Sequence, residues 1–271
     1  MKRAETPGVS VVQIRTGQAD VFIRGTSPLI YNAMSEKAWH ELLMPKGRKT
    51  AADKAENLKH EPKMEFRNSV YAWRDDQDHP TRLRFPSAAF RKSMGAAALD
   101  LPGMKKAQVE RLVWIDEPSV DIYGIPQLFM SIVRSADMNH TPDVRTRAIV
   151  PLWCCHFTMQ FVETILKSGQ IAHLLGAAGI LAGIGDWRQQ KGGGNFGQFA
   201  VVSEEDAAMR GLMRNAGRKA QDAALADPAC YDDESTKMLA WFYEELEQRK
   251  LTPAPRKVRH NGTTADAGVE A

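Results

Sequence analysis

The chain has 271 residues, 43% of them hydrophobic and 25% charged, and its formal net charge is only +3. A chain of this length and hydrophobic content can bury a sizeable core, so it fits one large domain or two small ones. No apolar run is long enough to cross a bilayer, and none follows the basic residues at the start, so we expect neither a transmembrane helix nor a signal peptide. The three cysteines lack zinc-site spacing, and adjacent Cys154 and Cys155 are too constrained to bridge each other comfortably, which suits a reducing cytoplasm.

The first quarter of the chain is expected to hold short strands, one helix and an insertion. Alternating apolar residues predict two strands within 9–30, joined by a hairpin-like turn at 16–18. A helix is expected over 35–43. The stretch 46–63 is rich in lysine and nearly free of large apolar residues, which indicates a mobile insertion, and a further strand is expected at 69–73.

A second helix is expected over 88–99, because its alanines favour helix and Ser87 is a suitable N-cap. Arginines precede this helix, and Arg91 and Lys92 lie in its first turns. A phosphate held at the helix N-terminus is one interpretation of that pattern. The alternative is that Arg91 and Lys92 form the solvent-exposed face of an amphipathic helix.

The middle of the chain is expected to supply most of the sheet. Strands are predicted at 109–115, 122–133 and, most clearly, 151–162. In the last of these, apolar and polar side chains alternate, so that one face is suited to the core and the other is polar but uncharged. The first face comprises Trp153, Cys155, Phe157, Met159 and Phe161, and the second comprises Cys154, His156, Thr158 and Gln160.

The last third of the chain is predicted to be mainly helical. A helix is expected over 168–181, followed by a glycine-rich loop and a short strand at 199–202. Ser203 with Asp206 resembles a capping box for a helix that runs toward residue 225. A final amphipathic helix is expected over 234–251.

These predictions give a core domain over 1–202 with an insertion at about 45–80. The C-terminal helices over 203–251 are expected to pack on this core. The tail, 252–271, contains prolines and small residues and is predicted to be disordered.

The loop between the last predicted helix of the core and its final strand has six glycines within fifteen residues, 183–197. Glycine allows close approach of the backbone and leaves amide donors exposed, and a phosphate accepts hydrogen bonds from such donors. Arg188 and Lys191 add positive charge, and Trp187 and Phe196 offer flat faces on which a base can stack. The loop therefore indicates nucleic-acid binding, whereas the alternative is that it merely packs over the core with both aromatic residues as plugs.

Two nucleotide-binding motifs are disfavoured. In a triphosphate-binding P-loop a lysine and a Ser or Thr follow the glycines, but here Lys191 precedes the glycine cluster and neither Ser nor Thr comes after it. A dinucleotide-binding loop runs from a strand into a helix, whereas this loop is predicted to run from a helix into a strand. We expect no cofactor.

Catalytic patterns are sparse, and we do not expect an enzyme. The seven histidines show no metal-ligand spacing. Asp75, Asp76 and Asp78 form an acidic cluster near a predicted turn, but the cluster lacks the central glycine and the terminal glutamate of a calcium loop. A solvated turn is the better interpretation of these residues.

Two segments carry a resemblance to a known family. Phe85-Pro86-Ser87, followed by Phe90-Arg91-Lys92, and the glycine-rich loop over 183–199 resemble the RAMP superfamily, the RRM-like backbone and processing subunits of CRISPR effector complexes, and bacteriophage proteins that share their pattern. The resemblance implies an α/β (α+β) fold with an RRM-like or ferredoxin-like antiparallel sheet, helices on one face, an inserted finger and helical C-terminal additions.

In such proteins the loop, the helix entry and a sheet face hold a nucleic-acid strand. The partner implied here is single-stranded RNA or DNA, bound largely independently of sequence in the cytoplasm of a bacterial host, with self-association into an oligomer or filament along the strand. The expected nucleic-acid-binding residues are Ser87, Arg91, Lys92, His156, Gln160, Trp187, Arg188, Lys191, Gly192, Gly193, Gly194, Asn195 and Phe196, with Gly197 in the same loop.

Two other classes of function stay open. The first is a RAMP-type nuclease, which cuts RNA with a histidine near the first helix or with a loop aspartate and a metal ion. The second is a protein-interaction subunit of a phage assembly, for which no nucleic-acid affinity is expected. The candidate catalytic residues of the nuclease are His40, His79, Asp75, Asp76, Asp137 and Asp143.

Overall fold

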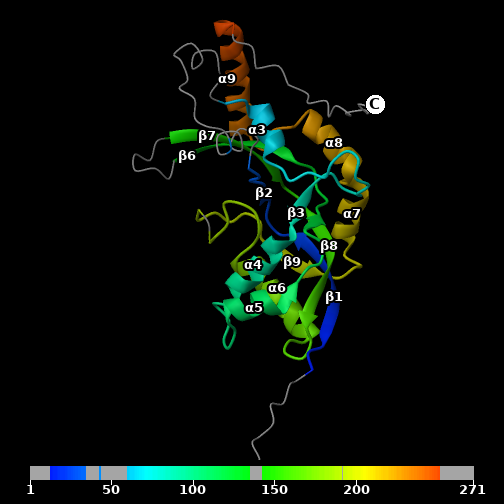
Figure 1. The fold of residues 1–271 in the computed structure, drawn as a ribbon. Helices are drawn as coiled ribbons and strands as arrows, with labels where there is room; N and C mark the ends of the chain where they lie inside the picture. Colours follow the sequence, from blue (N-terminus) through cyan, green and yellow to red (C-terminus); the bar gives the residue numbers. More distant parts are fainter. Residues whose placement is uncertain (1–12, 35–42, 44–59, 135–141, 191, 251–271) are drawn as a thin grey trace, which may run out of the picture.

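A computed structural model of the chain describes residues 13–34, 43, 60–134, 142–190 and 192–250 (Figure 1). Its centre is a four-stranded sheet in the order β4-β8-β1-β9, in which every neighbouring pair is antiparallel. Helix α4 follows β1 along the chain, and helix α6 connects β8 to β9. The bounds of these elements are Thr16–Gly25 for β1, Ser87–Ala97 for α4, Val113–Trp114 for β4, Cys154–Val162 for β8, Ser168–Leu181 for α6 and Phe199–Val202 for β9.

The connectivity of these six elements is β-α-β-β-α-β, with the first and third strands at the centre of the sheet. This arrangement is the ferredoxin-like fold, which RRM domains share. Helices α4 and α6 both lie on one face of the sheet (Figure 1). The expected fold class is therefore confirmed.

The core lies between this sheet and its two helices. Every second residue of β8 points inward, because successive side chains of a strand alternate between the faces of a sheet. The ring of Phe90 in α4 lies 4.8 Å from that of Phe157 and 6.1 Å from that of Phe199. The opposite face of the sheet carries the polar residues of β8, with β1 residues as their partners.

Two smaller sheets and a short helix extend the core. Strands β2 (Leu29–Ile30), β7 (Pro142–Val150) and β6 (Gln127–Arg134) form an antiparallel sheet in the order β2-β7-β6, and β3 (Arg84–Pro86) pairs with β5 (Ser119–Asp121). Helix α3 (Pro62–Asn68) packs against β7 and buries Phe66 completely. Part of the expected insertion thus lies against the body of the protein, and 44–59 lies outside the described residues.

Three further helices attach to this body through buried polar groups: α7 (Ala207–Asn215), α8 (Arg218–Ala226) and α9 (Asp233–Arg249). The fully buried side chain of Gln221 accepts hydrogen bonds from the N–H groups of Arg82 and Leu83. Its amide nitrogen donates to backbone carbonyls, including that of Ile122. The Ser235 hydroxyl accepts from the N–H of Met130 at 2.9 Å and so fixes the start of α9 on β6.

Several predicted elements are correct. Strands β8 and β9, helix α6 and the final helix agree closely with the predicted ranges. The helix expected over 88–99 is α4, which begins one residue earlier. The helix expected over 35–43 falls almost wholly outside the described residues, and so does the whole tail, 252–271, for which disorder was predicted. Among the helices that the structure describes, none is both long and apolar enough to span a membrane.

Other predictions are wrong. The turn at 16–18 does not exist, because β1 continues through Gly17, which pairs with Phe161. The strand over 109–115 is instead helix α5 (Lys106–Leu112) followed by β4, since Val109, Leu112 and Val113 have helical rather than alternating spacing. Of the strand expected at 69–73, the structure shows only a bridge between Ala72 and Leu83.

The expected helix caps also differ. The N-cap of α4 is Pro86, and Ser87 lies inside the helix, where its hydroxyl donates to the carbonyl of Glu117. Asp206 alone caps α7 by accepting from the N–H of Met209 at 2.8 Å. The helix that was expected to run toward residue 225 is two helices, because the chain breaks at Gly217 before α8. Strand β7 was not predicted.

Candidate nucleic-acid interface

The glycine-rich loop and the first turns of α4 face each other across a cavity of about 240 Å³, here called the cleft. Helix α4 supplies one wall and the loop supplies a second. A third wall comes from residues near β2 and from β3 and the segment before it. The α4 wall comprises Ala88, Ala89 and Lys92, and the loop wall comprises Gly185, Asp186 and Arg188. The third wall comprises Asn32, Tyr71, Phe85 and Pro86.

Backbone hydrogen bonds fix the base of the loop beside β2. The N–H of Asp186 donates to the carbonyl of Ile30 at 3.0 Å, and that of Gly197 donates to Pro28 at 2.8 Å. Gly197 has φ 72°, and a Cβ there would lie 1.7 Å from the carbonyl oxygen of Ile184. Glycine at this position is therefore required by the packing of the loop itself, not by a ligand.

The tip of the loop is open at Gly193 but tightly packed at Gly194, where a Cβ would lie 2.1 Å from the carbonyl oxygen of Trp187. Gly193 has φ 69°, and a Cβ built on it meets nothing within 4 Å. The N–H groups of Gly194 and Asn195 have no acceptor among the described residues. The carbonyl of Gly192 accepts from the Trp187 indole N–H at 3.1 Å. Within the described part of the chain these two amides are donors that an anion could use, and Lys191, the remaining predicted residue of the tip, lies outside that part.

One carboxylate faces the cleft, but its charge is matched. Asp186 forms an ion pair with Arg147 of β7, with 2.5 Å between Nη1 and Oδ2. Arg147 is 8% exposed and Asp186 is 6% exposed, so the pair lies out of water. Burial lowers the pKa of Arg147, nearby Asp186 opposes that shift, and Arg145 adds to it. The pair holds the loop against β7. Because the two charges cancel, the net charge of the cleft is set by its other residues.

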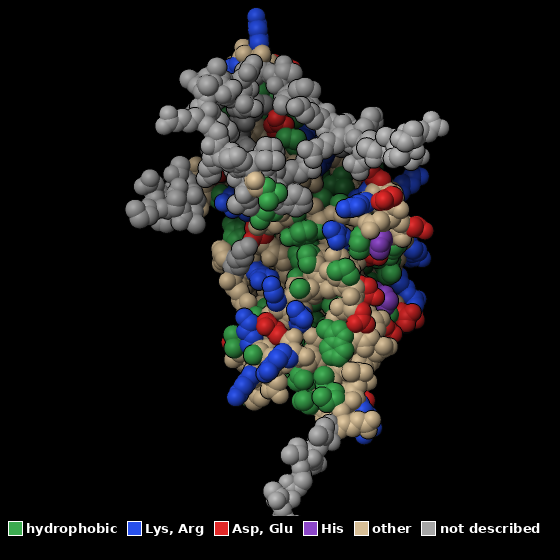
Figure 2. Space-filling model, in the orientation of Figure 1, with side chains coloured by type: hydrophobic (Ala, Val, Ile, Leu, Met, Phe, Trp, Pro, Cys, Tyr) green, Lys and Arg blue, Asp and Glu red, His purple; other side chains and the backbone are tan. Residues whose placement is uncertain are grey.

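Among the other residues that line the cleft, two are basic and none is acidic. Lys92 is exposed on α4, and Arg188 is half-buried in the loop. The Nε atoms of Arg91 and Arg188 are both buried without a hydrogen-bond partner in the described part of the chain. Figure 2 shows Lys and Arg side chains gathered over α4 and α5 on this side of the molecule. The N-cap Pro86 offers no side-chain acceptor to the first turn of α4, so the positive end of that helix adds to the charge.

Three of the expected binding residues serve the packing of the protein. The Ser87 side chain is buried and already donates to Glu117. Trp187 and Phe196 are half-buried, with ring centroids 5.6 Å apart, and each lies 6.4 Å from Phe129 of β6. These contacts match the alternative interpretation of the loop, in which its aromatic residues are plugs.

His156 and Gln160 lie elsewhere, on the open face of the main sheet. The exposed His156 ring stacks on Phe22, its register partner in β1, at 4.5 Å and 20°. Gln160 donates to Asp116 at 3.1 Å. This face is flat and aromatic, but its carboxylates, including Asp20, make it less attractive to phosphate than the cleft. Phe22 was not singled out from the sequence; its alternation with buried Val21 and Ile23 is the signal that could have placed it on this face.

Three of the described candidate catalytic residues take part in separate contacts with other side chains. Asp75 pairs with Arg82 at 2.6 Å, and Asp143 contacts His60 at 3.1 Å. His79 stacks on Trp73 at 3.7 Å, and its Nδ1 lies 3.4 Å from Asp121. In the described ranges no group of three His, Cys, Asp or Glu side chains could hold a metal ion. His40 and Asp137 are outside those ranges.

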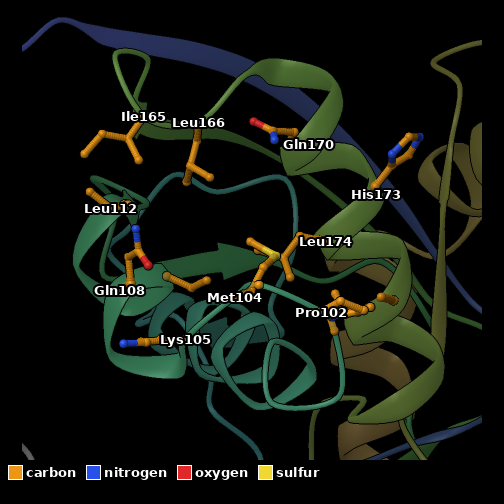
Figure 3. A pocket seen from close by; sticks show the side chains of 14 residues that line it. Pro102, Met104, Lys105, Gln108, Leu112, Ile165, Leu166, Gln170, His173 and Leu174 are labelled. Carbon is orange, nitrogen blue, oxygen red and sulfur yellow. The ribbon is translucent and has the colours of Figure 1, made fainter.

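A larger cavity of about 430 Å³ lies away from the cleft, between α5, the loop before it and α6 (Figure 3). Its lining is mainly apolar and includes Met104, Leu112, Ile165 and Leu174. Lys105 and His173 belong to its rim, but their side chains point away from the hollow (Figure 3). This groove is suited to an apolar surface rather than to an anion.

Comparison with known proteins adds no assignment, because no protein-family model matches the chain and no curated protein is significantly similar to it.

Proposed function

We propose that this protein binds single-stranded nucleic acid in the cleft between the glycine-rich loop and α4, without cutting it. One observation carries the proposal: Lys92 and Arg188 line the same cavity from different walls, and Arg188 belongs to the loop whose tip has two amides without an acceptor among the described residues. Backbone amides, helix N-termini and basic side chains are the groups that contact phosphates in nucleic-acid complexes. Contacts of this kind position a strand without reading its sequence.

Two further points support the proposal. The ferredoxin-like fold is shared with RRM domains, which bind single strands, although they do so on the open sheet face and not beside the helices. The segments that resemble RAMP proteins are the same two that form the cleft, the entry of α4 and the glycine-rich loop. Binding to RNA and to DNA is proposed alike, since phosphate contacts do not distinguish them.

The direct test is fluorescence anisotropy of labelled single-stranded RNA and DNA at low salt. The double variant Lys92→Gln/Arg188→Gln is expected to bind at least tenfold more weakly than the unchanged protein. Lys219→Gln, which removes one charge from an exposed position of α8, is a matched control and should bind normally. Absence of binding by the unchanged protein at low salt would reject the proposal.

The same samples test the nuclease alternative. After incubation with Mg²⁺ or Mn²⁺, the labelled strand is run on a denaturing gel, and we expect it to stay intact. Cleavage that disappears in His79→Ala or Asp76→Ala would instead assign catalysis to the turn at 75–79.

Self-association is a second candidate function, favoured by unlike surfaces at two ends of the molecule. Helix α9 projects from one end in Figure 1, with Trp241 60% exposed and Tyr243 38% exposed. The apolar groove of Figure 3 lies toward the other end. Helix α9 has five acidic and two basic residues, whereas the segment 105–112, part of which lines the groove, has three basic residues and a single acid, Glu110. We propose that α9 of one copy docks in the groove of the next, a head-to-tail contact that does not close.

Complementary variants test this contact without nucleic acid. Trp241→Asp and Ile165→Asp each alter an exposed side chain, so both proteins should fold. Alone, each is expected to sediment as a monomer. When the two variants are mixed, the intact groove of Trp241→Asp should bind the intact α9 of Ile165→Asp. The product should be a one-to-one dimer, to which no further copy can add because its free groove and its free α9 are the altered ones. A monomeric unchanged protein at high concentration would contradict the proposal.

A further inference from the structure

We infer that the cleft holds one nucleobase of the bound strand, turned out of its stack, with Tyr71 as its stacking partner. The inference rests on the proposed function and goes further, because it names the part of the strand that enters the cleft and the side chain that receives it. Its starting point is the chemical difference between the walls of the cleft.

One wall of the cleft is aromatic. The rings of Tyr71 and Phe85 meet edge to face at 5.7 Å and 85°, and Tyr31 lies behind them, 5.3 Å from Phe85. Phe85 is 5% exposed and Tyr31 is fully buried, whereas Tyr71 is half-buried. Tyr71 is therefore the ring of this cluster with surface left to cover, and its neighbours hold it in a fixed orientation.

The polar end of Tyr71 is also poorly occupied. Its hydroxyl has one long contact, 3.5 Å to the backbone carbonyl of Asn32. Burial, and to a lesser extent the nearby Asp186 carboxylate, raises the pKa of this hydroxyl, so it remains a donor at neutral pH. A ring with a hydroxyl donor suits a base, which combines a flat face with acceptors along its edge.

The cleft is too small for a length of strand. Its volume of about 240 Å³ is below the ~300–1,000 Å³ of sites that enclose a whole drug-sized ligand. One ring system fits such a space. The phosphate attached to that ring would lie at the rim, where Lys92 and Arg188 provide positive charge.

The other aromatic residues of the loop do not line the cleft. Trp187 and Phe196 are half-buried like Tyr71, but they pack on each other and on Phe129, whereas Tyr71 is part of the cleft wall. The stacking expected of these two residues from the sequence is therefore assigned to Tyr71.

The test uses a single-stranded oligonucleotide that contains the fluorescent base 2-aminopurine. Its fluorescence rises when the base leaves its stack in the strand and falls when the base stacks on an aromatic side chain. One titration therefore reports both the emission of the bound base and the affinity for the strand. Binding to the unchanged protein should change the emission from that of the free strand. Tyr71→Ala should lose this change and bind about tenfold more weakly, because one stacked base contributes that much or more. Tyr71→Phe keeps the ring and should retain both signals.

Tyr123→Ala, which removes a half-buried tyrosine that lines neither the cleft nor the groove, is the matched control and should bind and change the emission as the unchanged protein does. A second measurement does not depend on any variant. A strand carrying 5-iodouridine, crosslinked by light to the unchanged protein, should attach to the peptide that contains Tyr71.

The outcomes separate the two proposals. Salt-sensitive binding with equal affinity in Tyr71→Ala and no crosslink to the Tyr71 peptide would overturn the inference and leave the proposed function standing. If Tyr71→Ala fails to fold, the crosslink decides in the same way. No binding by the unchanged protein would overturn both.

Discussion

Arg147 of β7 and Asp186 of the glycine-rich loop form a buried ion pair that joins the second sheet to the wall of the cleft. The pair fixes the loop where it lies beside β2, and Arg147 neutralises the one carboxylate among the residues that line the cleft. The shape and the charge of the cleft therefore depend on a residue that no nucleic acid needs to touch.

Asp186→Asn is expected to lower the free energy of unfolding by about 3–5 kcal/mol, because it leaves the Arg147 guanidinium buried without its counter-charge. Urea denaturation followed by circular dichroism measures this change. The double variant Arg147→Met/Asp186→Leu should recover most of the loss, since an apolar pair carries no desolvation cost. Asp20→Asn, on the open sheet face, is the control, and a similar loss there would contradict the role assigned to burial.

Two glycines of the loop should respond differently to alanine. Gly197→Ala is expected to cost about 3 kcal/mol or more, because its Cβ would overlap the carbonyl oxygen of Ile184 at a left-handed backbone conformation. Gly193→Ala should cost only about 1–2 kcal/mol, the strain of the left-handed conformation in open space. Thermal or urea unfolding of both variants measures the two losses of stability. Equal losses would show that the backbone at Gly193 is packed as tightly as that at Gly197.

The sequence was most informative for elements whose residue pattern reflects burial against one neighbouring layer only. The alternation in β8 and the apolar stripe of α6 each reflect burial against a single neighbouring layer, and both elements were predicted correctly. Strand β7 was missed because Arg145 and Arg147 interrupt its apolar pattern. Burial of Arg147 depends on Asp186, which is distant in the chain, and no local pattern reveals such a pairing.

The candidate site was predictable only in part. The glycine cluster and the basic residues of α4 mark two of its walls by composition. The third wall was missed because Asn32 and Tyr71 come from separate segments that the fold alone brings together. The packing of Trp187 and Phe196 on Phe129 has the same origin, since Phe129 belongs to another sheet.

The salt dependence of the binding constant should give the number of phosphate contacts. For single strands, each contact contributes about 0.7 to the slope of log K against log salt concentration. Lys92→Gln and Arg188→Gln are each expected to reduce the slope by about that amount, and Lys219→Gln should leave it unchanged. Anisotropy titrations over a salt series give the three slopes. An unchanged slope in either cleft variant would remove that side chain from the phosphate site.

The three thiols should differ in reactivity. Cys154 and Cys155 are fully buried, and burial raises the pKa of the Cys154 thiol to about 12, with a further contribution from Asp206. Since the thiolate is the reactive form, neither should react with Ellman's reagent in the folded protein at neutral pH. Cys230 is half-buried and should react alone. Rapid release of more than one equivalent of thionitrobenzoate before denaturation would contradict this expectation.

The same buried thiol predicts a loss of stability in alkali. Above the ordinary thiol pKa of 9.0 the unfolded chain releases the Cys154 proton, whereas the folded protein keeps it up to a pKa of about 12. The unfolded state then binds fewer protons, so the free energy of unfolding must fall as pH rises through this window, by about 1.4 kcal/mol per pH unit for this group. Cys154→Ala should reduce the slope of the free energy of unfolding against pH by that amount. The packing that is lost with the thiol should lower the free energy of unfolding equally at every pH. Urea denaturation from pH 8 to pH 10.5 separates the two effects, and an unchanged slope would mean that the thiol ionises in the folded protein.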